Sequence, residues 1–138
     1  MATYLIDTNV YIRAANTAPE RAALAAFAAR QTAVPVSTIV LAEVLLGVTG
    51  PRERAKTVRL VTAGERPLTP TRRDWLVASR AIAALGGEAV TKSRSFWNDT
   101  LLAAQCARLG LVLVTHNVAD FARLARVIPM TAVAPFPA

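Results

Sequence analysis

The sequence predicts an α/β fold in which a central parallel sheet is flanked by helices. Short apolar runs, as at 3–6 and 111–115, alternate with longer segments whose apolar residues recur at helical spacing. Strands separated by helices pair in parallel through right-handed crossovers. The 138 residues are 54% hydrophobic, which is enough to build one domain with one core over residues 1–138.

Capping residues and prolines mark the helices expected in the first half of the chain. Thr8 or Asn9 can cap a helix directly after the first strand, because short polar side chains accept hydrogen bonds from free N–H groups. Pro19 and Pro51 each suit a first helical turn, and Gly47 suits a helix end. The expected elements are a strand at 3–6, helices at about 8–15 and 19–30, a strand at 34–36, a helix at about 37–47 capped by Ser37 or Thr38, and a helix from 51.

The second half of the chain repeats the alternation and ends in a short tail. Thr71 can cap a helix that the pair Gly86 and Gly87 ends, and Gly110 can end the next helix. Apolar residues recur at helical spacing along the first of these helices, at Trp75, Ala78, Ile82 and Leu85. The expected elements are a minimal strand at Leu68, a helix at 71–85, a loop at 88–95, a helix at about 96–109, a strand at 111–115, a short helix or turn at 117–124, a strand at 127–130 and a loose tail from 134.

Polar residues follow two of the predicted strands at the same edge of the sheet. Asp7 comes directly after strand 3–6, and Asn117 and Asp120 come just past strand 111–115. The carboxyl ends of parallel strands meet at one edge, where α/β sheets bind their ligands. Each residue also has a structural interpretation: Asp7 as a helix N-cap, Asn117 in a local turn, and Asp120 as a surface acid at a helix start.

Two further acids lie among apolar residues. Glu43 is the only charged residue between positions 39 and 46, in a helix that is apolar on nearly every face and is therefore expected to be buried. A buried carboxylate needs a cation, which either an arginine of this chain or a metal ion can provide. Asp99 lies at the start of the predicted helix 96–109, where it either complements the helix dipole or points into a cleft.

Together these acids match the ligand preferences of magnesium and manganese. Hard divalent cations take oxygen ligands, and Mg²⁺ sites use a few carboxylates and keep several waters. Such ions make a water nucleophilic and stabilise charge on a phosphate, and phosphodiester cleavage requires both. The single cysteine and single histidine, Cys106 and His116, support neither a zinc site nor a Ser-His-Asp set, and the chain has no Gly-rich phosphate loop.

The net charge of +7 and the pI of about 11.0 have two explanations. Arginine forks onto phosphate oxygens, so its excess favours a nucleic-acid partner. An Arg- and Ala-rich composition inherited from a GC-rich genome explains the charge equally well. No membrane span or signal peptide is recognisable, and a lone cysteine excludes an internal disulfide, so we expect a cytoplasmic protein.

Four segments of the chain, in this order, resemble the PIN-domain family. They are Ile6-Asp7-Thr8-Asn9, the helix at 37–43, the run from Asn98 to Ala104, and the run from Thr115 to Phe121. The resemblance covers residues 4–127, and the chain length looks like that of the VapC-type toxins of bacterial toxin–antitoxin pairs. It implies a PIN-like single domain that acts as a ribonuclease, a hydrolase that depends on Mg²⁺ or Mn²⁺.

The resemblance also implies roles for individual residues. Asp7, Glu43 and Asp99 match the family's three principal acids, which act as catalytic groups and metal ligands. Many members have Asp where this chain has Asn117, so the resemblance makes Asp120 the candidate for the fourth charge and leaves the second metal site open. The residues expected to support the site or to contact RNA are Thr8, Ser37, Arg94, Thr115 and Asn117.

The leading hypothesis is an endoribonuclease toxin that cleaves RNA phosphodiesters with a metal-activated water. By the same resemblance, the expected partners are RNA, a cognate antitoxin that covers the acids with an extended segment carrying Arg or Lys, and a second copy in a homodimer. Helices around 21–30 and 58–63 are candidates for the dimer face, although core packing explains their apolar residues as well. The alternative is a catalytically weak PIN-like regulator that only binds RNA or antitoxin. A phosphatase with an aspartyl nucleophile is disfavoured, because it needs a second Asp where Asn9 stands.

Overall fold

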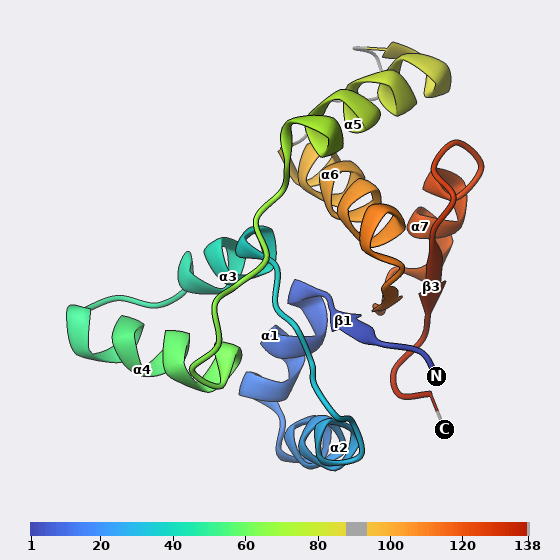
Figure 1. Ribbon diagram of the computed structural model, residues 1–138. Helices are drawn as coiled ribbons and strands as arrows, with labels where there is room; N and C mark the ends of the chain where they lie inside the picture. The colour runs from blue at the N-terminus through green and yellow to red at the C-terminus, as the bar shows by residue number, and fades with distance from the viewer. Residues whose placement is uncertain (88–93, 138) are drawn as a thin grey trace.

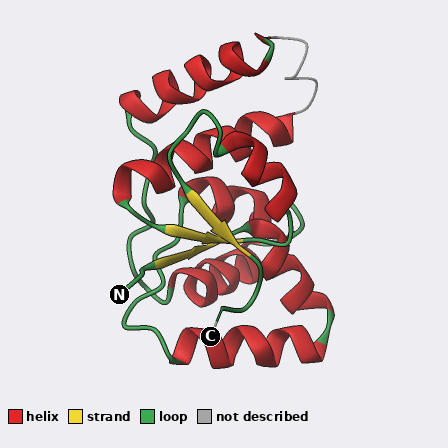
Figure 2. Cartoon of the chain, turned by 90° about the vertical axis from the view of Figure 1, so that its right-hand side faces the viewer, coloured by secondary structure: helices red, strands yellow, loops and turns green. Residues whose placement is uncertain are grey.

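The computed structural model describes residues 1–87 and 94–137, and it has a parallel sheet at its centre (Figure 1). The strands β1 (Tyr4–Ile6), β2 (Val112–Val114) and β3 (Thr131–Val133) lie in the order β1-β2-β3. Both pairs are parallel, with Tyr4 opposite Val112 and Val112 opposite Thr131. Helices cover both faces of this sheet, as Figure 2 shows, so the predicted α/β fold is confirmed.

Helices connect the strands, and most begin where the sequence predicts. Prolines lie in the first turns of α2 and α4, the Ser37 hydroxyl caps α3, and Thr71 forms a capping box with Asp74 at α5. Gly110, with a φ of 67°, ends α6 in the left-handed conformation that glycine adopts most readily. In the described residues the helices are α1 (Thr8–Asn16), α2 (Ala18–Ala29), α3 (Thr38–Leu45), α4 (Pro51–Thr62), α5 (Arg72–Leu85), α6 (Arg94–Leu109) and α7 (Val118–Leu124).

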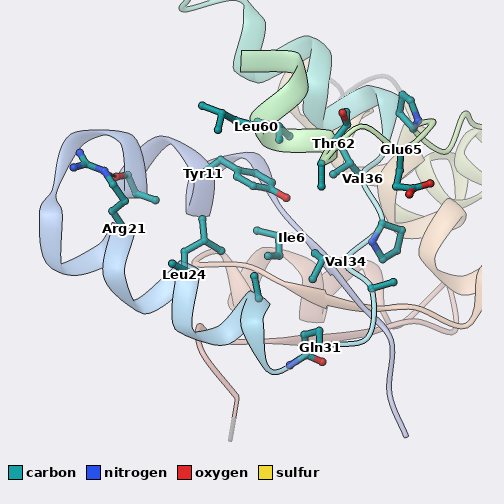
Figure 3. Close-up of a pocket in the computed structure, with 18 of the residues that line it drawn as sticks. Ile6, Tyr11, Arg21, Leu24, Gln31, Val34, Val36, Leu60, Thr62 and Glu65 are labelled. Atoms are coloured by element: carbon teal, nitrogen blue, oxygen red, sulfur yellow. Dashed lines mark hydrogen bonds between the residues drawn. The ribbon is translucent and has the colours of Figure 1, made fainter. Parts of the chain in front are cut away.

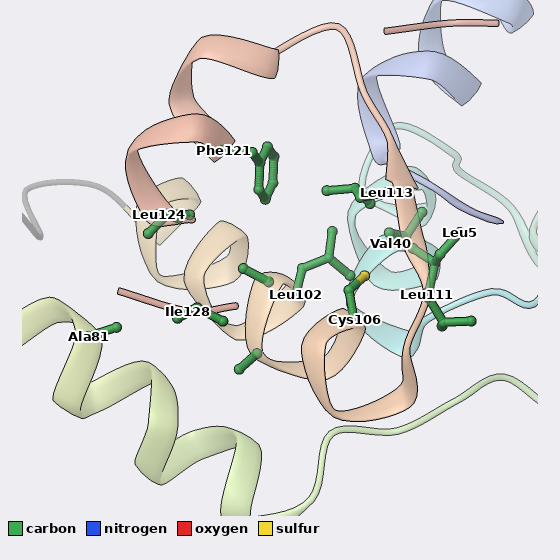
Figure 4. Packing of buried hydrophobic residues seen from close by; sticks show 12 residues of the cluster. Leu5, Val40, Ala81, Leu102, Cys106, Leu111, Leu113, Phe121, Leu124 and Ile128 are labelled. Carbon is green, nitrogen blue, oxygen red and sulfur yellow. The ribbon is translucent and has the colours of Figure 1, made fainter. Parts of the chain in front are cut away.

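The core lies on both faces of the sheet because successive strand residues point to opposite sides. Leu5 and Leu113 pack in one cluster with buried residues of α6 and α7, such as Phe121 (Figure 4). Ile6 and Val114, the next residues along β1 and β2, pack on the other face in a smaller cluster with residues of α1 and α2. Burying both faces explains why the strands have no polar alternation.

Two predicted strands are absent from the described residues. The segment 34–36 forms no strand, and only an isolated bridge joins Ser37 to Leu68, with Leu68 donating its N–H to Val36. Pro35 lacks the N–H that a ladder needs, which limits this segment to a single bridge. No strand forms at 127–130: the turn that follows α7 reaches Val127 and Ile128, whose N–H groups donate to the Leu124 carbonyl, and β3 begins at Thr131.

Three smaller expectations are also corrected. The tail expected to be loose packs against α2, with the Phe136 and Phe27 ring centroids 5.5 Å apart. Trp75, expected on the apolar face of α5, is 53% exposed, and the neighbouring Asp74 is buried in its place. The expected loop at 88–95 lies mostly outside the described residues, and α6 begins at Arg94, before the predicted start. No helix in residues 1–87 and 94–137 has the length and apolar character to cross a membrane.

Candidate functional site

Asp7 lies at the carboxyl end of β1, directly before α1. Its carboxylate Oδ1 accepts a 2.8 Å hydrogen bond from the backbone N–H of Thr8, so Asp7 is the N-cap of α1. The side chain is nevertheless buried, with 4% of its surface exposed, and burial raises its pKa above the ordinary value of 3.8. The cap therefore does not account for the cost of placing this carboxylate inside the protein.

A hydrogen-bonded network joins Asp7 to the end of β2. The Thr115 hydroxyl donates to Asp7 Oδ2 at 2.8 Å, and the Asn9 amide donates to the same oxygen and to Thr115 Oγ1, each at 3.2 Å. The backbone N–H of His116 donates to Asn9 Oδ1 at 3.1 Å. The two strand ends thus meet as the parallel topology predicts. Asn9 was expected as a possible cap and as part of the segment that resembles the family, but not as a partner of Asp7; its position two residues after Asp7 was the available signal for this contact.

Glu43 projects from α3 toward the first turn of α1 and the start of α6. Its Oε1 accepts a 2.8 Å hydrogen bond from the Thr8 hydroxyl, and its Oε2 accepts a 3.3 Å bond from the Asn98 amide. The side chain is only partly buried, because α3 lies nearer the surface than its apolar sequence suggests. Asn98 begins one of the segments that resemble the family, but no role at the site was predicted for it.

Asp99 lies inside α6, partly buried and near enough to the other three acids for their charges to act on it. Because α6 begins at Arg94, Asp99 is beyond the first turn, and the helix-dipole explanation of this acid is wrong. Burial, followed by the negative charges of Asp7, Glu43 and Asp120, raises its pKa to about 7. No described residue donates a hydrogen bond to its carboxylate, so nothing in the described chain compensates its charge.

The four acids have no basic partner among the described side chains. The one ion pair found there joins Arg108 to Asp74 at 2.8 Å, on the α5–α6 interface away from these acids. No three described Asp, Glu, His or Cys side chains converge closely enough to enclose an ion as they stand. The donor set consists of oxygens alone, which suits Mg²⁺ or Mn²⁺ and does not suit zinc.

The remaining predicted site residues differ in how they are placed. Asn117 is the exposed N-cap residue of α7, and its backbone N–H donates to Thr115 Oγ1 at 3.0 Å. Asp120 is exposed in the first turn of α7, close enough for its charge to act on Asp99. Ser37 is fully buried and its hydroxyl caps α3 at Ile39, so it has no exposed surface for RNA. The Arg94 side chain lies outside what the structure describes.

The described part of the chain has hollows at its surface, and two of them differ in their relation to the acids. The larger, of about 900 Å³, lies between α1, α2 and α4, and Figure 3 shows Tyr11 and Leu24 beside it. Its lining is mostly apolar and includes none of the four acids. The smaller, of about 450 Å³, has Glu43 and Asn98 in its wall. The smaller hollow therefore adjoins the candidate site, and the larger one does not.

Comparisons with known proteins agree with this fold. A family model described as the PIN domain matches residues 4–127. Among solved structures, VapBC-1 from nontypeable Haemophilus influenzae matches with 22% identity and a TM-score of 0.74, covering 96% of this chain and 97% of that one. VapBC from Salmonella typhimurium, bound to DNA, matches with 20% identity, a TM-score of 0.72, and coverage of 97% and 98%. VapBC2 from Rickettsia felis matches with 18% identity, a TM-score of 0.69, and coverage of 96% and 98%. No curated protein sequence matches the chain.

Proposed function

Because this chain belongs to the PIN domain family, we propose that it is a metal-dependent endoribonuclease and the toxin of a toxin–antitoxin pair. The observation that carries the proposal is the position of Asp99, a partly buried acid among three other carboxylates with no described basic partner. Its pKa is raised to about 7 by burial and by three neighbouring carboxylates, and no described side chain neutralises the group. Perturbed acids that gather at the edge of a sheet are typical of a site that recruits a cation from outside the chain.

Asp7 and Asp99 are the proposed ligands of the ion, with Glu43 and Asp120 in support. When bound there, Mg²⁺ or Mn²⁺ would neutralise the carboxylates and lower the pKa of a water for attack on an RNA phosphodiester. The fit rests on the all-oxygen donor set and on the mutual repulsion of the acids. No three described acids converge as they stand, so the ion would have few carboxylate ligands and several water ligands.

The polar neighbours hold these acids in position. Thr115 and Asn9 both donate to Asp7 Oδ2, which leaves Oδ1 with only the backbone N–H of Thr8. The Thr8 hydroxyl donates to one carboxylate oxygen of Glu43, and the Asn98 amide donates to the other. Ligand carboxylates that are hydrogen-bonded in this way keep their orientation, which preserves the geometry of a site. Arginines elsewhere on the surface would bind the RNA backbone.

The direct test is RNA cleavage by the purified protein. We expect structured RNA to be cut with Mg²⁺ or Mn²⁺ and left intact with EDTA. Asp7→Asn should abolish cleavage, whereas Glu53→Gln, which changes an exposed acid at the start of α4, should cleave normally. Equal cleavage by wild type and Asp7→Asn would remove Asp7 from the site. Stable RNA binding without turnover at any divalent metal would favour the regulator instead.

A protein partner follows from the same proposal. The similar structures from Salmonella typhimurium and Rickettsia felis are VapBC assemblies, and another similar chain comes from a toxin–antitoxin complex of Klebsiella pneumoniae. We expect a cognate antitoxin to cover the four acids with an extended segment carrying Arg or Lys. Such a segment would bring basic side chains to the four acids, which have no basic partner among the described side chains, and co-expression should suppress cleavage.

A homodimer is also part of the proposal. The candidate face at 21–30 and 58–63 borders the larger hollow, and Leu60 there is 73% exposed. An exposed leucine beside an apolar groove is a reasonable contact for a second copy. Sedimentation at micromolar concentration should give a dimer that Leu60→Asp weakens, and a wild-type monomer would contradict it.

A further inference from the structure

The smaller hollow, of about 450 Å³, opens beside the proposed catalytic acids and has walls of two kinds. Glu43 and Asn98 form the wall that it shares with the acidic site. Leu46 and Trp75 form an apolar wall, and they are 74% and 53% exposed. A hollow that joins exposed apolar surface to a reactive centre suits a part of the substrate next to the reacting group.

Trp75 is exposed for a reason that lies in its helix. The preceding residue, Asp74, is buried and binds Arg108 through both carboxylate oxygens, at 2.8 and 2.9 Å. Because successive residues of an α-helix are about 100° apart, this clamp turns Trp75 away from the core. Its ring lies near that of Trp97 of α6, with the centroids 6.1 Å apart and the planes tilted by 48°. The paired rings present aromatic surface on the outside of the protein.

Polar groups suited to nucleic acid surround this aromatic surface. Thr38 and Thr69 line the hollow, and their hydroxyls form no hydrogen bond with any described residue. Arg72 is exposed three residues before Trp75 on α5, a spacing that places both on one side of the helix. Aromatic rings stack on unpaired bases, hydroxyls bond base edges, and arginine binds phosphate, so this combination is typical of single-stranded RNA recognition.

We propose that this hollow receives one unpaired base of an RNA strand, stacked on Trp75, while an adjoining phosphate lies at the acidic site. The proposal rests on the ribonuclease function and specifies its substrate as RNA with at least one unstacked base at the cleavage point. An apolar side chain of a protein partner would fit the hollow less well, because it would leave the hydroxyls of Thr38 and Thr69 without polar partners.

The test begins with cleavage kinetics of three variants on a short single-stranded RNA. Trp75→Ala should raise KM about tenfold, since stacking on an aromatic ring strengthens binding by that order. Trp75→Phe should recover most of the loss because phenylalanine retains a ring. Leu76→Ala is the matched control, since Leu76 is 59% exposed on the same helix but does not line the hollow. It should leave KM unchanged.

A second measurement reports on the hollow itself. Trp75 and Trp97 are the only two tryptophans of the chain, so its tryptophan fluorescence comes from this ring pair alone. With Asp99→Asn, which should bind RNA without cutting it, we expect the RNA to quench this emission. A set of oligonucleotides with one abasic position each should lose quenching and affinity at a single position.

The outcomes separate this proposal from the ribonuclease function. If wild type cleaves RNA but Trp75→Ala has an unchanged KM and no abasic position matters, the base site is wrong and the ribonuclease stands. If no metal supports cleavage, the ribonuclease proposal fails, and position-specific quenching still reports whether a base binds. If Trp75→Ala converts a dimer to a monomer and RNA leaves the emission unchanged, the surface contacts a second copy and the base site is overturned.

Discussion

Two neighbouring helices carry buried or partly buried aspartates whose electrostatics differ in sign. On α5, burial raises the pKa of Asp74, but hydrogen bonds and charge from Arg108 outweigh it, and the net pKa is lowered. On α6, burial and three surrounding carboxylates act in the same direction and raise the pKa of Asp99 to about 7. The chain supplies a cation to the first acid, and no described side chain supplies one to the second.

The difference distinguishes Asp74, which stabilises the contact between two helices, from Asp99, whose charge no described side chain neutralises. Asp74 completes a capping box with Thr71 and fastens α5 to α6, so all of its interactions are internal. The repulsion around Asp99 lowers stability unless another molecule relieves it. Such local conflicts are expected at functional sites, where binding requirements override the stability of the isolated chain.

The largest expected effect is the loss of RNA cleavage when Asp99 is replaced. Asp99→Asn should reduce RNA cleavage by about 100-fold or more, because it removes a proposed ligand and not merely an outer partner. The measurement is the cleavage rate at saturating Mg²⁺, with circular dichroism to verify folding. Asp74→Asn, assayed below its melting temperature, should cleave within about twofold of wild type. Similar losses in both variants would contradict the distinction between the two aspartates.

The paired aspartate should instead dominate stability. Asp74→Asn should lower the free energy of unfolding by about 2 kcal/mol, since it leaves Arg108 without its charge partner at a partly buried contact. Urea titration at pH 7 measures this change. Thr71→Ala is a useful companion, because it removes only the side-chain cap and should cost about 1 kcal/mol. An Asp74→Asn variant as stable as wild type would mean that the ion pair does not stabilise the contact between α5 and α6.

The two acids should also respond to pH in opposite directions. The folded-state pKa of Asp99, about 7, exceeds its ordinary value of 3.8, so the folded protein binds this proton more tightly than the unfolded chain. In EDTA, the melting temperature should therefore fall as pH rises from about 4 through 7, and Mg²⁺ should restore it most at pH 8. The lowered pKa of Asp74 contributes stability above 3.8 that is lost as pH falls below it.

A variant separates these two contributions. Asp99→Asn should flatten the loss of melting temperature between pH 5 and pH 8 and remove most of the gain from Mg²⁺. The acid-side loss that depends on Asp74 should remain. A wild-type melting temperature that is the same at both pH values without metal would show that the repulsion around Asp99 is relieved by other means.

The smallest effect is expected at the edge of the acidic site. Asp120→Asn should reduce cleavage about tenfold, because its charge acts on Asp99 from an exposed position on α7. Asn117→Ala should cost about twofold, since the contact of Asn117 with Thr115 is made by its backbone N–H and survives the substitution. A larger loss of cleavage with Asn117→Ala than with Asp120→Asn would assign the fourth ligand position to Asn117.

Topology made part of the site predictable. Asp7 and the residues after β2 were expected together because parallel strands end at one edge, and Asp7 Oδ2 does accept a 2.8 Å bond from Thr115. The metal roles of the four acids remain predictions. The hydrogen bonds of Asn9 to Asp7 and of Asn98 to Glu43 were not predicted, because an amide that orients a carboxylate has no sequence pattern apart from its acid. The strand predicted at 127–130 was wrong because Val127 and Ile128 still donate their N–H groups to the Leu124 carbonyl, in the turn that follows α7.

The sequence by itself determined the alternation of strands and helices, their caps, and the presence of acids where strands end. These features depend on local propensity and on hydrogen bonds within a few residues. Only the tertiary structure decided which acid received a cation. Asp74 meets Arg108 across two helices, whereas Asp7, Glu43, Asp99 and Asp120 are brought near one another from four separate segments. Charge interactions depend on distance in space and on burial, and neither is written in the spacing of residues along the chain.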